Sequence, residues 1–144
     1  MFREAASAAD ALRAQARENR PQLAELGRLL ATHPPRAVLT CARGSSAHAA
    51  IFAKYLIETR VGLLTSAVAP SVSSIYGARL DLSGCLFIAI SQSGRSPDLI
   101  AATSQATAAG ATTLALVNAE DSPLERAALH VLPLRAGPEL SAQT

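Results

Sequence analysis

One short polar segment of this sequence combines side chains that can bind an anion. Segment 91–97 reads Ser-Gln-Ser-Gly-Arg-Ser-Pro; it follows an apolar run and precedes a helical pattern that begins near Asp98. Its hydroxyls, its amide side chain and a glycine converge on one expected helix N-terminus, with proline at the first helical position. Such an end presents unpaired N–H groups and a partial positive charge, so the segment is predicted to bind a phosphate-like anion without a metal.

A second polar segment has the same character. Segment 42–48, Ala-Arg-Gly-Ser-Ser-Ala-His, follows another apolar run and leads into a helical pattern. If the two runs are neighbouring parallel strands, both segments face one cleft at the carboxyl edge of a sheet, where ligands of such folds bind. One would hold a phosphoryl group and the other the body of the ligand. Each segment alone also fits helix capping, because serine and glycine are common at N-caps and in turns; the pair together favours a binding site.

The rest of the chain alternates between helical and strand patterns. The alanine-rich stretch 4–17 predicts a helix, and Asn19 is placed to cap a second one that ends at the His-Pro-Pro of 33–35. The pattern then predicts an α/β fold: a doubly wound five-stranded parallel sheet with right-handed connections, preceded by two N-terminal helices. We expect a helical segment over 1–35 and a sheet domain over 36–144. The predicted strands are short, almost wholly apolar runs that fit burial on both faces: 37–41, 63–68, 85–90, 112–117 and 131–134.

The composition excludes several function classes. Of 144 residues, 49% are hydrophobic and 17% are charged, which suits one compact domain. The net charge of +2 is spread without runs of like charge, and aromatic residues make up only 3%, so nucleic acid is not an expected partner. No window approaches the roughly 20 apolar residues of a membrane span, so we expect a cytoplasmic protein with no membrane contact. Cys41 and Cys85 lack metal-ligand spacing and are predicted to be inert core thiols.

The chemistry of the two polar segments narrows the ligand. The sequence has neither a Gly-x-Gly-x-x-Gly fingerprint nor a glycine-rich loop that ends in Gly-Lys-Ser or Gly-Lys-Thr. A hydroxyl-rich cradle without lysine suits a phosphomonoester on a small polyol better than a triphosphate with magnesium. We therefore expect a small phosphorylated sugar as the ligand, with no metal and no cofactor.

Four segments of the chain match a known pattern: 42–46, 88–96 with its Ile-Ala-Ile-Ser-Gln-Ser-Gly core, 112–118, and 135–140 with Ala-Gly-Pro-Glu-Leu. Together they resemble the SIS (sugar isomerase) domain, a flavodoxin-like fold. The match is to the first SIS domain in the isomerase half of glucosamine-6-phosphate synthase and in SIS-type glucosamine-6-phosphate deaminases. The resemblance implies that Ser45 contacts the sugar. The residues that it implies for the phosphate are Ser46, Ser91, Gln92, Ser93 and Ser96.

The resemblance implies that this chain binds a phosphosugar, but it does not imply which residues would catalyse a reaction. In two-domain relatives a second SIS domain supplies the glutamate, histidine and lysine for ring opening and proton transfer, and this sequence stops at Thr144. Glu139 and His48 are the local candidates for acid–base catalysis. Glu139 also fits a capping or interface carboxylate, and His48 also fits a helix residue bonded to a neighbouring loop.

Three charged residues near the polar segments have open or structural interpretations. Arg43 fits a phosphate partner and a surface arginine equally well. For Arg95 the favoured interpretation is a solvated loop residue. For Asp98 the favoured interpretation is a carboxylate in the first helical turn that complements the helix dipole.

Two functional hypotheses follow from the sequence. In the first, the chain is the leading half of a glucosamine-6-phosphate deaminase or isomerase that acts by ring opening and aldose–ketose isomerisation. In the second, it is a stand-alone, non-catalytic module that binds or senses a phosphosugar; a single-domain isomerase with a site shared between subunits is less favoured. A homodimer is expected in either case, because the apolar stripe of Leu23, Leu26 and Leu30 would otherwise be uncovered.

Overall fold

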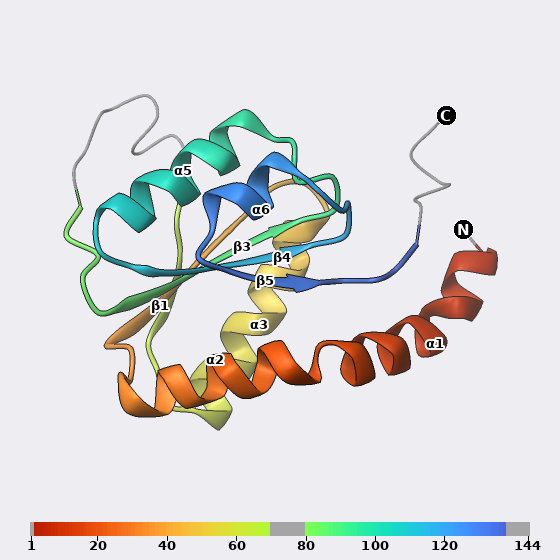
Figure 1. The fold of residues 1–144 in the computed structure, drawn as a ribbon, viewed down its shortest axis with the longest axis horizontal. Helices are drawn as coiled ribbons and strands as arrows, with labels where there is room; N and C mark the ends of the chain where they lie inside the picture. The colour runs from red at the N-terminus through yellow and green to blue at the C-terminus, as the bar shows by residue number, and fades with distance from the viewer. Residues whose placement is uncertain (1, 70–79, 138–144) are drawn as a thin grey trace.

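The computed structural model of the chain describes residues 2–69 and 80–137 and confirms the predicted α/β fold with two leading helices (Figure 1). Each predicted strand appears within a few residues of its expected bounds, because runs that are apolar throughout are typical of strands covered on both faces. The helices are α1 (Phe2–Glu18), α2 (Arg20–Thr32), α3 (Ser46–Arg60), α5 (Pro97–Ala108) and α6 (Pro123–Ala127). The strands are β1 (Ala37–Ala42), β2 (Thr65–Ala67), β3 (Cys85–Ser91), β4 (Thr112–Val117) and β5 (His130–Pro133).

The five described strands form one parallel sheet in the order β2-β1-β3-β4-β5. β3 lies in the centre, and all of its residues are buried. The strand order reverses between β1 and β3, which pair from Ala37 opposite Cys85 to Ala42 opposite Ile90. In sheets of this order, the ligand crevice lies at the carboxyl ends of the two strands that flank the reversal.

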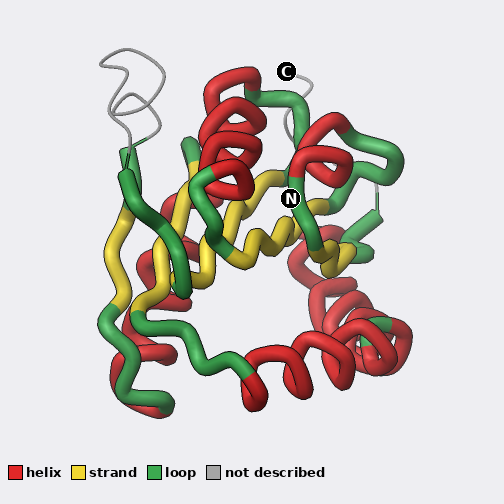
Figure 2. The backbone as a smooth tube through the Cα atoms, turned by 60° about the vertical axis from the view of Figure 1, so that its left-hand side comes forward, coloured by secondary structure: helices red, strands yellow, loops and turns green. Residues whose placement is uncertain are grey.

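Helices cover both faces of the sheet, as Figures 1 and 2 show, and the strand residues divide between two cores. Phe87 and Ala89 of β3 pack with α5 and α6 on one face. Leu86 and Ile88 point to the opposite face and pack with α2 and α3. This alternation follows from the two-residue period of a strand, and it explains why the run 85–90 is apolar without interruption.

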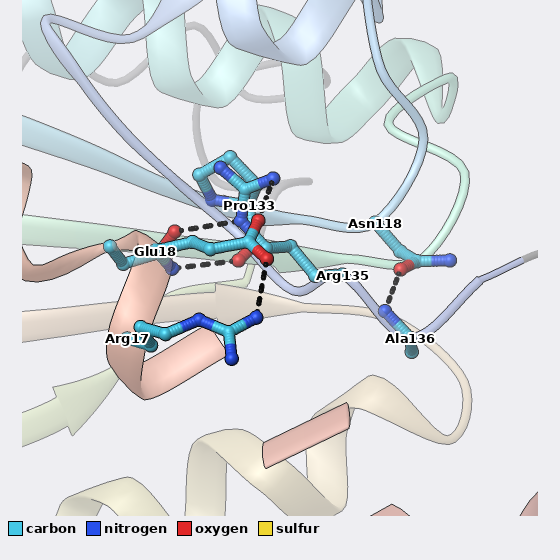
Figure 3. Close-up of polar contacts among 7 residues, drawn as sticks. Arg17, Glu18, Asn118, Pro133, Arg135 and Ala136 are labelled. Atoms are coloured by element: carbon cyan, nitrogen blue, oxygen red, sulfur yellow. Dashed lines mark hydrogen bonds and ion pairs between the residues drawn. The ribbon is translucent and has the colours of Figure 1, made fainter. Parts of the chain in front are cut away.

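The buried Asn19 corrects one prediction. It stands between α1 and α2, but its side chain makes no capping hydrogen bond. With 2% of its surface exposed, it instead donates from Nδ2 to the carbonyl oxygen of Pro133 (2.8 Å) and accepts from Nε of Arg135 at 3.1 Å. The junction between α1 and α2 packs against the end of β5, so the Asn19 side-chain amide forms hydrogen bonds with polar groups of Pro133 and Arg135 instead of capping α2. Figure 3 shows this cluster, in which Glu18 also pairs with Arg135 at 2.9 Å.

The leucine stripe proposed for dimerisation is also corrected. Leu26 is only 7% exposed and belongs to the core beneath the sheet, and Leu30 packs against the same core. The chain's own sheet therefore covers most of this stripe, and Leu23 alone is exposed. A larger exposed apolar face lies on α3. It consists of Ile51, Phe52, Tyr55 and Leu56, which we call the α3 apolar face.

Cys41 and Cys85 are buried free thiols in the core, as predicted. They lie on neighbouring strands, but Cys41 is opposite Ala89, four positions from Cys85. Four residues along a strand amount to about 13 Å, too far for a disulfide. No helix in the described part of the chain is long and apolar enough to cross a membrane. The cytoplasmic location stays a prediction.

Candidate functional site: a hydroxyl-lined cavity at the strand-order reversal

The two polar segments singled out in the sequence lie side by side at the carboxyl edge of the sheet. Their strands, β1 and β3, are hydrogen-bonded neighbours, and the last pair in their register is Ala42 with Ile90. The β1–α3 loop and the β3–α5 loop therefore begin next to each other. The prediction that both segments face one cleft is confirmed.

A cavity of about 230 Å³ opens between the two loops. It is smaller than the roughly 300–1,000 Å³ of pockets for drug-sized ligands, so its size suits a small polar molecule. All six residues predicted to bind phosphate or sugar lie along its wall. Its lining consists of Arg43, Gly44, Ser45, Ser46, Ile90, Ser91, Gln92, Ser93, Ser96 and Leu99.

Two helices point their N-termini at this cavity. Ser45 is the N-cap residue of α3 and Ser96 is that of α5, yet neither side chain makes a capping hydrogen bond. The alternative that these two serines serve as helix caps is therefore not supported. Their hydroxyls line the cavity beside helix ends whose first N–H groups favour negative charge.

The β3–α5 loop is held in shape by its own hydroxyls. Ser91 Oγ accepts a hydrogen bond from the backbone N–H of Gly94 at 3.0 Å, and Ser93 Oγ accepts from that of Arg95 at 3.4 Å. A serine hydroxyl has one proton to donate besides its acceptor lone pairs. Both hydroxyls therefore order the loop while keeping a donor for an anion, which only accepts.

Gly94 packs this loop against the loop between β4 and α6. Its φ is +62°, and a Cβ at this position would lie 2.4 Å from Oγ of Ser122. Two backbone hydrogen bonds hold the same contact, from Ala119 N in the β4–α6 loop to Gln92 O (3.0 Å) and from Leu124 N in α6 to Gly94 O (3.1 Å). The supporting role of Ser122 was missed at the sequence level. Ser122-Pro123 signals a helix start there, and nothing local links it to residue 94.

An ion pair crosses the rim of the cavity. Nη1 of Arg43, in the β1–α3 loop, donates to Oδ2 of Asp98 in the first turn of α5. Asp98 thus occupies the predicted helix-dipole position and has a second role that the sequence did not indicate. Both charges act on the buried Cys41: burial, and then the Asp98 carboxylate, raise the pKa of its thiol to about 12, while Arg43 partly opposes them.

Two further candidates do not line this cavity. His48 is exposed on α3, and Arg95 is exposed in the β3–α5 loop; neither is part of the lining. The placement of Arg95 agrees with the solvated position that the sequence favours. Glu139 lies outside the described residues.

Comparison with known proteins gives the family. The family model described as the SIS domain matches residues 33–144. Glutamine–fructose-6-phosphate aminotransferase (isomerizing) from Halobacterium salinarum is 40% identical over 97 residues, which are 67% of this chain and 16% of the relative. The same enzyme from Symbiobacterium thermophilum is 39% identical over 108 residues, 74% of this chain and 17% of the relative. The chain thus spans less than a fifth of these curated relatives.

Solved structures agree with the fold. A protein from Silicibacter pomeroyi described as a phosphosugar isomerase matches with a TM-score of 0.93 and 39% identity. The alignment covers 96% of this chain and 42% of that one. The C-terminal domain of glucosamine-fructose-6-phosphate aminotransferase from Francisella tularensis matches with a TM-score of 0.66 and 25% identity, over 74% of this chain and 30% of that one.

Proposed function

This chain belongs to the SIS domain family, and from that premise we propose that its cavity binds a small phosphorylated sugar. One observation carries the proposal. Ser45 and Ser96 occupy the N-caps of two helices without capping them, and their side chains line the same cavity as four further hydroxyl or amide residues. A site with many neutral donors at two positive helix ends suits a phosphate group on a polyhydroxyl ligand.

In this proposal the β3–α5 loop holds the phosphate and the β1–α3 loop reaches the sugar. Ser91, Gln92, Ser93 and Ser96 surround the end of α5 and donate to the phosphate oxygens. Ser46 donates to the same phosphate from the first turn of α3, and Ser45, beside it, contacts the sugar. The cavity lining supports a ligand shared by the two loops, because residues of both line the same cavity.

The sugar is proposed to be a hexose or amino-hexose 6-phosphate. The relatives named above act on fructose 6-phosphate by their printed names, and one structural relative is described as a phosphosugar isomerase. On this basis the chain would be the leading half of a glucosamine-6-phosphate deaminase or isomerase. The longer protein would open the sugar ring and interconvert aldose and ketose. The proposed cytoplasmic location and homodimer accompany this function.

A second candidate function, binding or sensing without conversion, is favoured by one feature of the cavity. Among the described residues that line it, none is a carboxylate, a histidine or a lysine. Aldose–ketose isomerisation needs a base near the carbon beside the carbonyl and an acid for the ring oxygen. The described cavity therefore supplies binding groups, and conversion would require further residues.

Calorimetric titration tests the proposal. The protein is titrated with glucosamine 6-phosphate and fructose 6-phosphate, and with glucosamine and fructose as controls. We expect binding that requires the phosphate. Ser93→Ala should weaken it by about 1–3 kcal/mol, because one desolvated donor is lost. The exposed Ser104 of α5 is not part of the cavity lining, and Ser104→Ala should leave affinity unchanged.

Two outcomes would count against this function. Absence of heat with millimolar phosphorylated ligand, the weak end of measurable affinity, would contradict binding by this chain. Equal affinities for phosphorylated and unphosphorylated sugars would contradict the phosphate cradle. A parallel assay for ammonia release from glucosamine 6-phosphate tests whether this chain converts the sugar by itself. Release would contradict the non-catalytic binding module.

A further inference from the structure

Arg43 is the single charged side chain among the described residues that line the cavity. Its guanidinium carries five N–H donors in a planar fork, and within residues 2–69 and 80–137 its one hydrogen-bond partner is Asp98, reached through Nη1. Its side chain is 61% exposed, so it sits at the rim and not in the core. It is thus a cation at the mouth of a cavity whose other described lining residues are uncharged.

The ion pair with Asp98 determines where this guanidinium is held. Asp98 is fixed at the start of α5, where its Oδ1 also accepts from the backbone N–H of Leu99 at 3.0 Å. Leu99, the next residue, lines the cavity. The Asp98 carboxylate therefore holds Arg43 close to the N-terminus of α5, where the phosphate is proposed to bind. Exposed ion pairs of this kind contribute little stability, so Arg43 can reorient at small cost.

We propose that Arg43 is a phosphate-binding residue of this cavity, held over it by Asp98, which acts as a positioning residue. This inference rests on the proposed function and adds a specificity-determining cation to it. The guanidinium matches the geometry of phosphate oxygens and can keep one N–H group on Asp98 while others turn to the ligand. It also offsets the repulsion that the Asp98 carboxylate would exert on an incoming dianion.

Arg95 provides a matched control for this inference. It belongs to the β3–α5 loop itself, carries the same charge and is exposed, yet it does not line the cavity. If only the long-range field of a positive charge matters, Arg43→Gln and Arg95→Gln should weaken phosphosugar binding equally. If Arg43 contacts the phosphate, its substitution alone should have a large effect.

The test measures glucosamine 6-phosphate affinity of four proteins by calorimetry: wild type, Arg43→Gln, Arg95→Gln, and the double variant Arg43→Gln/Asp98→Asn. We expect Arg43→Gln to bind about ten-fold or more weakly, the loss typical of a hydrogen bond to a charged group, and Arg95→Gln to stay within about two-fold. The double variant should recover part of the loss, because it removes the unneutralised carboxylate. Thermal unfolding of each variant verifies that the fold is retained.

The outcomes separate this inference from the proposed function. If wild type binds in a phosphate-dependent manner but Arg43→Gln matches Arg95→Gln, the role of Arg43 is contradicted and the function stands. If the double variant regains full wild-type affinity, Arg43 merely neutralises Asp98, and direct phosphate binding is contradicted. If wild type shows no phosphate-dependent binding, the proposed function fails and the inference fails with it.

Discussion

Gly94 lies in the β3–α5 loop, between residues that line the cavity. Its positive φ costs any L side chain about 1–2 kcal/mol, and a Cβ would meet Ser122 Oγ at 2.4 Å and Val117 Cγ2 at 2.9 Å. Only glycine lets the β3–α5 loop close onto the β4–α6 loop and keep the hydroxyls of 91–96 facing the cavity. The backbone of this one residue thus connects loop geometry with ligand binding.

Three glycine substitutions separate the cost of backbone strain from the cost of the steric clash. Gly94→Ala should lower the free energy of unfolding by about 2–5 kcal/mol, through backbone strain and overpacking together. Gly44→Ala, with φ +55° and open space around the Cβ, should cost only the strain of about 1–2 kcal/mol. Gly27→Ala, inside α2 with nothing within 4 Å, should stabilise by about 1 kcal/mol. Urea unfolding measures all three, and equal costs at Gly94 and Gly44 would contradict the packing argument.

The buried thiol of Cys41 makes a prediction about pH. Burial raises its pKa to about 12 in the folded chain, against an ordinary value of 9.0. Between pH 9 and 12 the thiol ionises in the unfolded chain but stays protonated in the folded one, so unfolding releases a proton. This thiol should therefore lower stability as pH rises through that window, by up to about 1.4 kcal/mol per pH unit.

The measurement compares wild type with Cys41→Ala. Urea unfolding at pH 8.5 and pH 10.5 gives the change in stability for each protein. We expect a steeper loss in wild type, because groups other than Cys41 titrate equally in both. The same loss in both proteins would show that Cys41 does not contribute.

Among the elements, the leading helices depend on polar contacts with the end of β5. α1 extends beyond the sheet in Figure 1, and its Leu12 is 64% exposed, so apolar burial does little to hold it. α2 contributes Leu26 to the core. The junction between them is held by Asn19, which bonds to Pro133 and Arg135. A buried amide therefore links the helical segment to the sheet.

Asn19→Ala should cost about 1–3 kcal/mol of unfolding free energy, because it leaves buried polar groups without partners. Asn118 is the matched control. Its side chain likewise makes two hydrogen bonds near the end of β5, accepting from Ala136 N (2.8 Å) and donating to Gly137 O (2.7 Å), but these hydrogen bonds are exposed. Water can replace those bonds, so Asn118→Ala should cost less. Chemical denaturation compares the two variants, and equal costs would contradict a special role for the buried junction.

At the scale of the whole molecule, the proposed homodimer requires an uncovered apolar surface, and the α3 apolar face provides one. Phe52 is 65% exposed there, whereas Leu26 of the originally predicted stripe is in the core. Exposed patches of large apolar side chains mark interaction surfaces, and a two-fold dimer would bury the same face from both copies.

Sedimentation at tens of micromolar, a rough working range, tests this surface. We expect wild type to be a dimer, Phe52→Asp to be a monomer, and Leu23→Asp to remain a dimer, because Leu23 is an isolated exposed leucine whose stripe neighbours pack under the sheet. A monomeric wild type would contradict the dimer. If Leu23→Asp dissociates the dimer and Phe52→Asp does not, the dimer interface lies on α2 and not on the α3 apolar face.

The sequence by itself determined the layers of the fold and the position of the two polar loops. Short runs that are apolar throughout are typical of strands covered on both faces, and the strand at 85–90 carries this signal in every residue. A parallel arrangement brings all carboxyl ends to one edge, so the segments 42–48 and 91–96 were found from local pattern, while the roles of Ser45 and Ser46 came from the family resemblance. The SIS resemblance at the same residues agrees with the family match over 33–144.

Only the tertiary structure decided which partner each polar side chain contacts. The amide of Asn19 looks like a helix cap in sequence but bonds to Pro133, 114 positions away. The Arg43–Asp98 pair and the contact of Gly94 with Ser122 join residues on different loops. Leu26 is covered by a sheet that follows it in the chain. Sequence pattern reports the period of burial within one element; packing between distant elements determines which polar groups find partners and which remain free for a ligand.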